Sequence, residues 1–462
     1  MTPLVELPSP VVEEIVDRAG RPDFERWSEQ LQRCGYCSRP VRLRGRVVQQ
    51  SASGRRLAYS TDHEPDRVLM IRCGNRRAAV CPSCSWEYAG DMWQLLYAGA
   101  AGGRKGVPES IRAHPLVFTT LTAPGFGAVH TTRADRHGKQ ARCRPTRAKH
   151  KLCEHGRPTG CTAIHGADDP RLGQPLCSDC YDYPAHAAFN WHAPELWRRF
   201  TIALRRVLAR RAGLTAKAFA ERCRLSFVKV AEFQRRAVVH FHALIRLDGP
   251  GTEFGPPHVG LDTADLAHAI CEAAGLVRLT VDMPDGARLE LRFGKQTDTQ
   301  PINDGPTGEL TPERAADYIA KYATKSADDF GLGDRRITLE VLPLLDISDH
   351  VTRLVQTCWQ LGEHETYNGL RRWLHMLGFH GHFASKSRRY STTLGAIRGE
   401  RRAYRQRQAA EQIRELLDED TTLVISHWEF IGQGYRTIGD ATLALSAANR
   451  AREKRNAARD AA

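Results

Sequence analysis

The chain has 462 residues, with 67 Lys and Arg against 53 Asp and Glu and a net charge of +14. This length allows two or three domains, and the positive balance favours a polyanionic partner because basic side chains release counterions when they bind phosphates. No apolar run is long enough to span a bilayer, and the N-terminal segment lacks the features of a secretory signal, so we expect a cytoplasmic protein with no membrane partner. In a reducing cytosol the 13 cysteines favour metal ligation over disulfides.

The amino-acid composition changes several times along the first half of the chain. Residues 85–98 follow a cysteine-rich, basic segment and have the spacing of an amphipathic helix. The Gly/Ala-rich segment 98–114 is interpreted as a weakly structured linker. The β-branched, apolar run 116–122 predicts a buried strand, and the polar segment at about 130–192, rich in Cys, His and Gly, predicts an insertion in a folded core.

The second half alternates helices and strands. Residues 194–213 predict a helix with one apolar face and several arginines elsewhere on its surface. Two strands are expected at 225–233 and 237–247, and the short turn between them indicates an antiparallel hairpin. The segment 311–327 predicts a further helix with a threonine N-cap, and most of the basic chain after it is also expected to be helical.

His240 and His242 flank Phe241 in the second strand of the expected hairpin. Because side chains alternate between the two faces of a strand, both imidazoles point to one face and Phe241 points to the other. This spacing favours a shared metal ion over two separate core histidines, and Glu232 or Gln234 on the neighbouring strand can supply an oxygen ligand. Imidazole with oxygen ligands and open positions suits Mg²⁺ or Mn²⁺ better than a closed zinc site.

Tyr318 and Tyr322 are four residues apart on the helix expected at 311–327, so they lie on one face. A phenol has a pKa of about 10 and is a weak nucleophile at neutral pH. A nearby metal ion and the ammonium group of Lys321 would stabilise a phenolate. Alone, the pair is more typical of packing tyrosines; beside the two histidines, it indicates a nucleophile.

The first group of cysteines contains two C-x-x-C knuckles, Cys34 with Cys37 and Cys81 with Cys84. Each knuckle resembles half of a structural four-cysteine zinc site. Their separation requires a β-rich loop that returns the chain between them. Cys73 is a spare thiol that can replace one of the four ligands.

A second group lies within the predicted insertion, where six candidate ligands compete for four positions. We expect the four cysteines Cys153, Cys161, Cys177 and Cys180 to bind zinc, with His155 and His165 as alternates. A polar, glycine-containing segment of this length needs such a metal to become ordered. The nearby Cys143 receives no role. The sequence thus predicts one or two structural zinc ions.

Three motifs occur in the order found in one known superfamily. AVVHFHALIRLD resembles the histidine motif of HUH endonucleases, DYIAKYATK resembles their two-tyrosine motif, and LVFTTLTAPG is similar to their first-strand motif. With CGYC, AAVCPSC, LCSDCYDY and GHFASKSRRYSTTLGAIR, the chain resembles the replication initiators of actinobacterial plasmids and integrative elements. The resemblance spans roughly residues 34–445 and so covers most of the chain.

This resemblance implies a role for each candidate side chain. His240 and His242 are the ligands of a divalent ion, Mg²⁺ or Mn²⁺, and Glu232 is the third ligand. Tyr322 is the primary nucleophile, and Tyr318 is a second tyrosine used when replication terminates. In the mechanism that the resemblance implies, a tyrosine attacks one phosphodiester, forms a 5′-phosphotyrosine and frees a 3′-OH that primes synthesis.

The resemblance also implies partners. Lys321 assists at the scissile phosphate of origin DNA, which is presented as a single strand or a hairpin, while a host helicase and polymerase extend the product. One departure is Ala237, where the family usually carries glycine. The alternatives are an HUH relaxase or transposase, and a non-catalytic zinc-dependent regulator that binds DNA but does not need its tyrosines.

The expected fold is α+β, an HUH-type antiparallel sheet with flanking helices and zinc-stabilised segments. We expect an N-terminal zinc-knuckle region at 1–97, a linker at 98–114 and a nuclease domain at 115–330 that contains the insertion at about 130–192. Residues 331–462 are expected to form a helical, basic C-terminal region.

Overall fold

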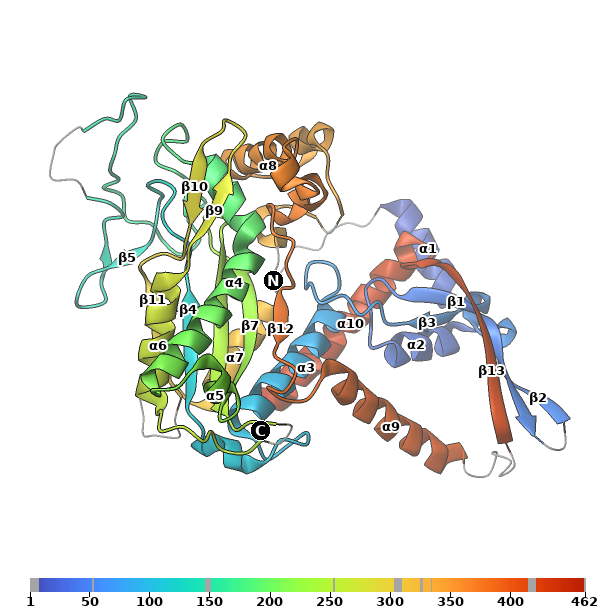
Figure 1. Ribbon diagram of the computed structural model, residues 1–462. Helices are drawn as coiled ribbons and strands as arrows, with labels where there is room; N and C mark the ends of the chain where they lie inside the picture. The colour runs from blue at the N-terminus through green and yellow to red at the C-terminus, as the bar shows by residue number, and fades with distance from the viewer. Residues whose placement is uncertain are drawn as a thin grey trace. The chain divides into compact units, whose positions relative to one another are not determined.

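The computed structural model forms two compact units (Figure 1). The central unit contains residues 92–394, and the terminal unit combines residues 1–91 with residues 395–462. The structure describes these ranges: 8–51, 54–145, 151–251, 254–302, 310–324, 327–333, 335–413 and 421–460. Within this described part of the chain, every helix is too short or too polar to serve as a membrane span.

A five-stranded antiparallel sheet forms the centre of the central unit, in the order β11-β4-β8-β7-β12. The expected hairpin is confirmed, because β7 pairs antiparallel with β8 and places Glu232 opposite His240. The prediction of an α+β fold with the two histidines on a central strand is therefore confirmed. The strand bounds are β4 Leu116–Leu121, β7 Arg224–Phe233, β8 Val239–Asp248, β11 Thr297–Pro301 and β12 Ala384–Lys386.

The hairpin turn places Ala237 in a conformation that favours glycine. Ala237 has a φ of 63°, in the left-handed region that glycine adopts most easily. Its carbonyl oxygen accepts hydrogen bonds from His186 Nε2 at 3.0 Å and from Asn190 Nδ2 at 3.1 Å. These two contacts hold the turn against the helix that covers the sheet.

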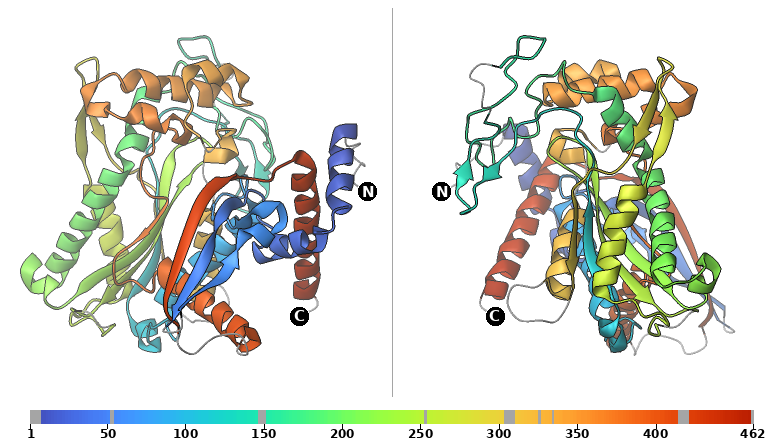
Figure 2. Two further views of the ribbon diagram at one scale, coloured as in Figure 1. Left: turned by 90° about the vertical axis from the view of Figure 1, so that its right-hand side faces the viewer. Right: turned by 60° about the vertical axis from the view of Figure 1, so that its left-hand side comes forward.

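Helices cover both faces of this sheet (Figure 2). On one face Phe241 packs against Trp197 of α4, with ring centroids 5.5 Å apart. On the other face His242 contacts Tyr322 of α7. The single strand β8 thus sends an aromatic side chain into the core and imidazoles to the opposite side, as the alternation predicts. The helices are α4 Tyr183–Arg211, α5 Ala216–Ala220, α6 Thr263–Leu276, α7 Pro312–Ala323 and α8 Asp349–Leu361.

The insertion follows β4 and is shorter than expected. Helix α4 begins at Tyr183, within the range 130–192 assigned to the insertion, because Asp182 caps it by accepting from Ala185 N at 2.9 Å. The segment that precedes α4 contains only the two-residue strands β5 Arg133–Ala134 and β6 Gln140–Ala141 among its described residues. A small hairpin, β9 Leu279–Asp282 with β10 Arg288–Leu291, forms a separate sheet.

The segment expected to be a linker differs in the structure. The segment 98–114 is packed, since Ala98, Val107 and Ile111 are buried together. Its alanines continue α3 (Pro82–Ala101) until Gly102, whose φ of 68° ends the helix.

The terminal unit joins the two ends of the chain. The region 331–462 is divided, because residues 331–394 belong to the central unit and residues 395–462 to the terminal unit. It is also not entirely helical: β13 pairs antiparallel with β1, and its β-branched and aromatic residues explain this strand. The bounds are α1 Ser9–Ala19, α2 Phe24–Arg33, β1 Val41–Ser51, β2 Gly54–Ser60, β3 Leu69–Ile71, α9 Leu394–Ile413, β13 Thr421–Gln433 and α10 Ile438–Asp460.

Candidate functional site

Two imidazoles and one carboxylate converge on the face of the sheet that α7 covers. Glu232 Oε2 lies 3.0 Å from His240 Nε2 and 3.1 Å from His242 Nε2. The three ligand atoms come from adjacent positions of β7 and β8, and all lie within 4.8 Å of one another. Of the two oxygen ligands that the sequence left open, the structure brings Glu232 to the histidines.

This donor set fits a divalent cation. The distances from Glu232 Oε2 to the two Nε2 atoms are those of hydrogen bonds. They also equal the spacing of about 3 Å between neighbouring ligands of an octahedral ion with bonds near 2.1 Å. Two nitrogens and one carboxylate leave positions open for phosphate oxygens or water. His240, His242 and Glu232 are therefore the residues that would hold Mg²⁺ or Mn²⁺.

A side chain that the sequence reasoning missed orients this group. Thr120 on β4 lies opposite His242, and its hydroxyl contacts His242 Nδ1 at 3.0 Å. A hydrogen bond at one ring nitrogen fixes the orientation of the ring and leaves the other nitrogen for the ligand position. Thr120 is the second threonine of the first-strand motif LVFTTLTAPG, so this motif could have pointed to it.

The two tyrosines of α7 lie directly against His242. The Tyr322 ring stacks on the His242 ring at 5.1 Å, and the Tyr318 ring meets it edge-on at 5.3 Å. The tyrosine rings are 4.7 Å apart, and Tyr318 also contacts Phe118 of β4. As expected, Thr311 caps the helix that carries them, accepting from Arg314 N.

The phenol of Tyr318 is perturbed by its surroundings. Burial and a hydrogen bond with Tyr322 hold the pKa of Tyr318 above its ordinary value. Lys321 lies between them in sequence on the exposed side of α7. The structure therefore brings both tyrosines to the site, whereas the side chain of Lys321 faces solvent.

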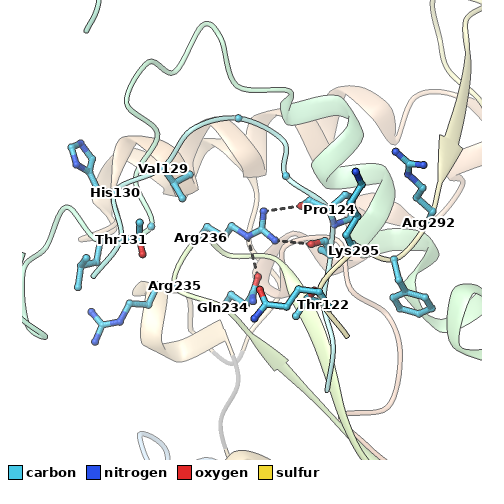
Figure 3. Close-up of a pocket in the computed structure, with 18 of the residues that line it drawn as sticks. Thr122, Pro124, Val129, His130, Thr131, Gln234, Arg235, Arg236, Arg292 and Lys295 are labelled. Carbon is cyan, nitrogen blue, oxygen red and sulfur yellow. Dashed lines mark hydrogen bonds between the residues drawn. The ribbon is translucent and has the colours of Figure 1, made fainter. Parts of the chain in front are cut away.

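A cationic pocket of about 900 Å³ lies beside the hairpin turn (Figure 3). Arg236 is fixed in its wall, donating to the carbonyls of Pro124 at 2.8 Å and Ala123 at 3.1 Å and to Gln234 Oε1 at 3.0 Å. The basic side chains that line the pocket are Arg144, Arg235, Arg236, Arg278, Arg292 and Lys295. Concentrated positive charge of this kind attracts phosphates.

A second pocket, of about 590 Å³, includes two of the candidate metal ligands. It is lined by Glu232 and His240 on one side and by residues 168–170 of the insertion on another. The turn residues Gln234 and Arg235 line both pockets, so the two hollows meet the same hairpin turn.

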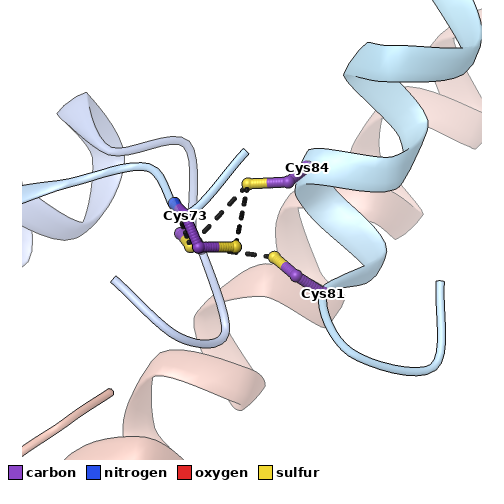
Figure 4. A group of neighbouring side chains, drawn as sticks. Cys73, Cys81 and Cys84 are labelled. Atoms are coloured by element: carbon purple, nitrogen blue, oxygen red, sulfur yellow. Dashed lines mark hydrogen bonds between the residues drawn. The ribbon is translucent and has the colours of Figure 1, made fainter. Parts of the chain in front are cut away.

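The cysteines of the terminal unit form a four-sulfur group that differs from the expected set. Cys37 Sγ lies 3.7 Å from both Cys81 Sγ and Cys84 Sγ, and Cys73 Sγ lies 3.7 Å from Cys84 Sγ (Figure 4). These distances match the edge of about 3.8 Å expected for sulfurs around a tetrahedral zinc ion. The expected ligand Cys34 lies outside this group, because its thiol is directed to the carbonyl of Leu31 at the end of α2.

The insertion divides its candidate ligands between two groups. Cys161, which was assigned to one site with Cys153, Cys177 and Cys180, instead joins His165. Cys143 was assigned no role from the sequence, because it lies in a basic, polar stretch, and His130 was not among the candidate ligands. The first group is His130, Cys143, Cys161 and His165, and the second is Cys153, His155, Cys177 and Cys180.

Comparisons with known proteins agree with the motifs. A family model described as replication initiator protein, pSAM2, matches residues 23–449. A replication initiator protein of Streptomyces ambofaciens is 42% identical over 454 residues, which cover 96% of this chain and 94% of the relative. No solved structure matches the chain significantly. These matches favour a replication initiator over the relaxase and transposase alternatives, and the chain belongs to the RepSA family of replication initiator proteins.

Proposed function

We propose that this replication initiator nicks one strand of its origin through Tyr322 and so starts rolling-circle replication. The observation that carries the proposal is the convergence of two tyrosine rings on His242, which is itself grouped with Glu232 and His240. A nucleophile and a cation site at such close range are what cleavage of a phosphodiester requires.

The chemistry follows from the positions of the side chains. The Tyr322 oxygen forms a bond to the phosphorus of the scissile phosphodiester, and the bond from phosphorus to the 3′ oxygen breaks. The products are a 5′-phosphotyrosine and a free 3′-OH, and the phenol proton moves to the departing 3′ oxygen through solvent. Stacking against His242 holds the attacking ring in place, while the ammonium group of Lys321 reaches the phosphate from the exposed side of α7.

A divalent ion held by Glu232, His240 and His242 would polarise the phosphate and stabilise negative charge as the bonds exchange. Burial and a hydrogen bond with Tyr322 raise the pKa of Tyr318. Tyr318 is assigned the role of the second tyrosine, for the transfer that ends replication.

The DNA strand beside the nick passes the cationic pocket. Arg235, Arg292 and Lys295 are exposed at its rim and can reach phosphates, whereas Arg236 is committed to the protein. Single-stranded or hairpin origin DNA is the proposed partner, and a host helicase and polymerase extend the 3′-OH. The group of Cys37, Cys73, Cys81 and Cys84 is proposed to hold a structural zinc ion.

The experiment is an adduct assay on the full chain with end-labelled single-stranded origin fragments and Mn²⁺. Wild type is expected to form a covalent protein–DNA adduct that chelator abolishes, and His242→Ala and Glu232→Ala are each expected to lower adduct formation by at least about 100-fold. His268→Ala, on the exposed side of α6, is the matched control and should retain full activity. If wild type binds the origin but forms no adduct with metal present, the protein is instead a DNA-binding regulator.

A further inference from the structure

The insertion between β4 and α4 has almost no hydrophobic core. Among its described residues from 128 to 180, the buried ones are Cys143, His165, Leu172, Gly173 and Cys177. Three of these five are thiols or imidazoles, while the apolar Leu152 and Ile164 are more than half exposed. A segment that buries so little apolar surface needs another source of order, such as bound metal.

The first ligand group is held by paired backbone. The segments that carry Cys143 and Cys161 form an antiparallel bridge, in which Arg144 N donates to the Cys161 carbonyl at 2.8 Å. His165 Nε2 lies 3.1 Å from His130 Nδ1 and 3.4 Å from Cys161 Sγ. These separations are within a few tenths of an ångström of the roughly 3.3–3.6 Å between ligands of a tetrahedral zinc ion.

A carboxylate supports this group from outside. His165 Nδ1 lies 2.7 Å from Asp169 Oδ2, so the ring presents Nε2 to the other three ligands. A carboxylate behind a histidine is the arrangement that orients imidazoles in zinc sites. Arg171 in turn holds Asp169 through an ion pair at 2.8 Å.

The second group has the geometry of a zinc knuckle. Gly156, with a φ of 70°, turns the chain after Cys153, and Arg157 N donates to Cys153 Sγ at 3.4 Å. His155 Nδ1 lies 3.2 Å from Cys180 Sγ. All four ligand atoms of this group lie within 4.8 Å of one another.

The two groups alternate along the chain. Ligand pairs follow one another as His130 with Cys143, Cys153 with His155, Cys161 with His165, and Cys177 with Cys180; the first and third pairs form one group, and the second and fourth form the other. We propose that the insertion binds two zinc ions in this cross-braced arrangement, one with two sulfurs and two nitrogens and one with three sulfurs and one nitrogen. The proposal does not depend on the tyrosine mechanism.

The cross-brace holds a wall of both pockets. Gly173 has a φ of 87°, and a Cβ atom there would lie 2.2 Å from the carbonyl oxygen of Arg235 in the hairpin turn. Leu172 lines the cationic pocket and also the pocket that contains Glu232. The metal-bound chain therefore sets the shape of both hollows.

The test is the zinc content of full-length variants, measured by native mass spectrometry. Cys143→Ser with Cys161→Ser should lose one ion, because both thiols serve the same ion, whereas Cys161→Ser with Cys177→Ser should lose two. If the second pair loses only one ion, or if Cys143→Ser alone loses none, the cross-brace is overturned. Cys271→Ser, on the exposed side of α6, is the control and should lose none.

If one substitution releases both ions, counting zinc in variants does not separate the two groups. A measurement on the unsubstituted chain separates them. Cadmium NMR of the cadmium-loaded protein should give two resonances for the insertion, in the ranges of two-sulfur and three-sulfur coordination. A single insertion resonance in the four-sulfur range would instead indicate one ion held by Cys153, Cys161, Cys177 and Cys180, and would overturn the proposal.

Discussion

His242 contacts four side chains of the site. It meets Thr120 at one ring nitrogen, Glu232 at the other, and the neighbouring rings of Tyr318 and Tyr322. Together these contacts fix the rotation of the imidazole ring, the nitrogen that it presents as a ligand and the face on which it stacks. The fixed position of this side chain would align the proposed nucleophile with the candidate cation site.

A second buried residue, Asp248, holds the far end of the same strand. It accepts from Arg246 Nε at 2.6 Å and Ser226 Oγ at 2.5 Å, and contacts His114 Nδ1 at 2.9 Å. Asp248→Ala leaves the Arg246 charge buried without its partner and is expected to destabilise the central unit by about 3–5 kcal/mol, read from the urea midpoint. Asp282→Ala, in an exposed ion pair, is the control and should change stability by less than about 1 kcal/mol.

The same network has a defined pH dependence. Burial alone would raise the pKa of Asp248, but hydrogen bonds with His114 and Arg246 outweigh burial and hold the pKa below its ordinary value. A lowered folded pKa stabilises the protein above the unfolded value of about 3.9, and this stabilisation is lost as the pH falls toward the folded value. The gap in urea midpoint between wild type and Asp248→Ala should therefore shrink from pH 7 to pH 3; an unchanged gap would contradict this account.

At the scale of single residues, the sequence predicted which side chains lie together better than it predicted the contacts that orient them. The pair His240 and His242 and the pair of tyrosines could be predicted to share a face because strand and helix periodicity places each pair there. Thr120 was missed because it reaches His242 across a strand pair, which no local pattern reveals.

At the scale of elements, the four-cysteine group of the terminal unit has a testable set of ligands for the proposed zinc ion. Cys73→Ser is expected to remove one zinc ion, because its sulfur lies 3.7 Å from Cys84 Sγ, whereas Cys34→Ser should retain that ion. Zinc counting on both variants checks this. If Cys34→Ser loses the ion and Cys73→Ser retains it, the ligands are instead the two C-x-x-C pairs that the sequence predicted.

The strands that the sequence predicted share an apolar character. The hairpin and β4 were recognised because buried strands read as β-branched and apolar runs. Strand β11 was not, because it lies at the sheet edge and its residues, TDTQP, are mostly polar. Helix α4 was predicted too short because Pro194 lies inside it, where a proline usually indicates a boundary.

At the scale of the whole molecule, the division into units could not be read from the sequence. Strand β13 pairs with β1 although some 370 residues separate them. In the same unit, Arg18 of α1 is bonded to Asp440 of α10 at 2.7 Å. Contacts across such a distance leave no local pattern, so the C-terminal region was assigned to a unit of its own.

The chain has a net charge of +14, and the basic side chains of the cationic pocket are the part of it that we expect to contact DNA. Arg292 is exposed at the cationic pocket, so Arg292→Ala should lower the slope of log affinity for single-stranded DNA against log salt by about 0.7, the loss of one phosphate contact. Arg198→Ala is the control, since Arg198 is exposed on α4 and paired with Glu195. Fluorescence anisotropy over a salt series measures both slopes, and equal slopes for the two variants would exclude Arg292 from the DNA path.

The most direct test of the central proposal is to identify the residue that becomes linked to DNA. The adduct formed by wild type is digested with protease and nuclease, and the modified peptide is sequenced by mass spectrometry. The proposal predicts the 5′-phosphate on Tyr322, with Tyr322→Phe abolishing or strongly reducing the adduct and Tyr404→Phe, on the exposed surface of α9, leaving it unchanged. A linkage to a residue outside α7, or an undiminished adduct in the double variant Tyr318→Phe with Tyr322→Phe, would contradict it.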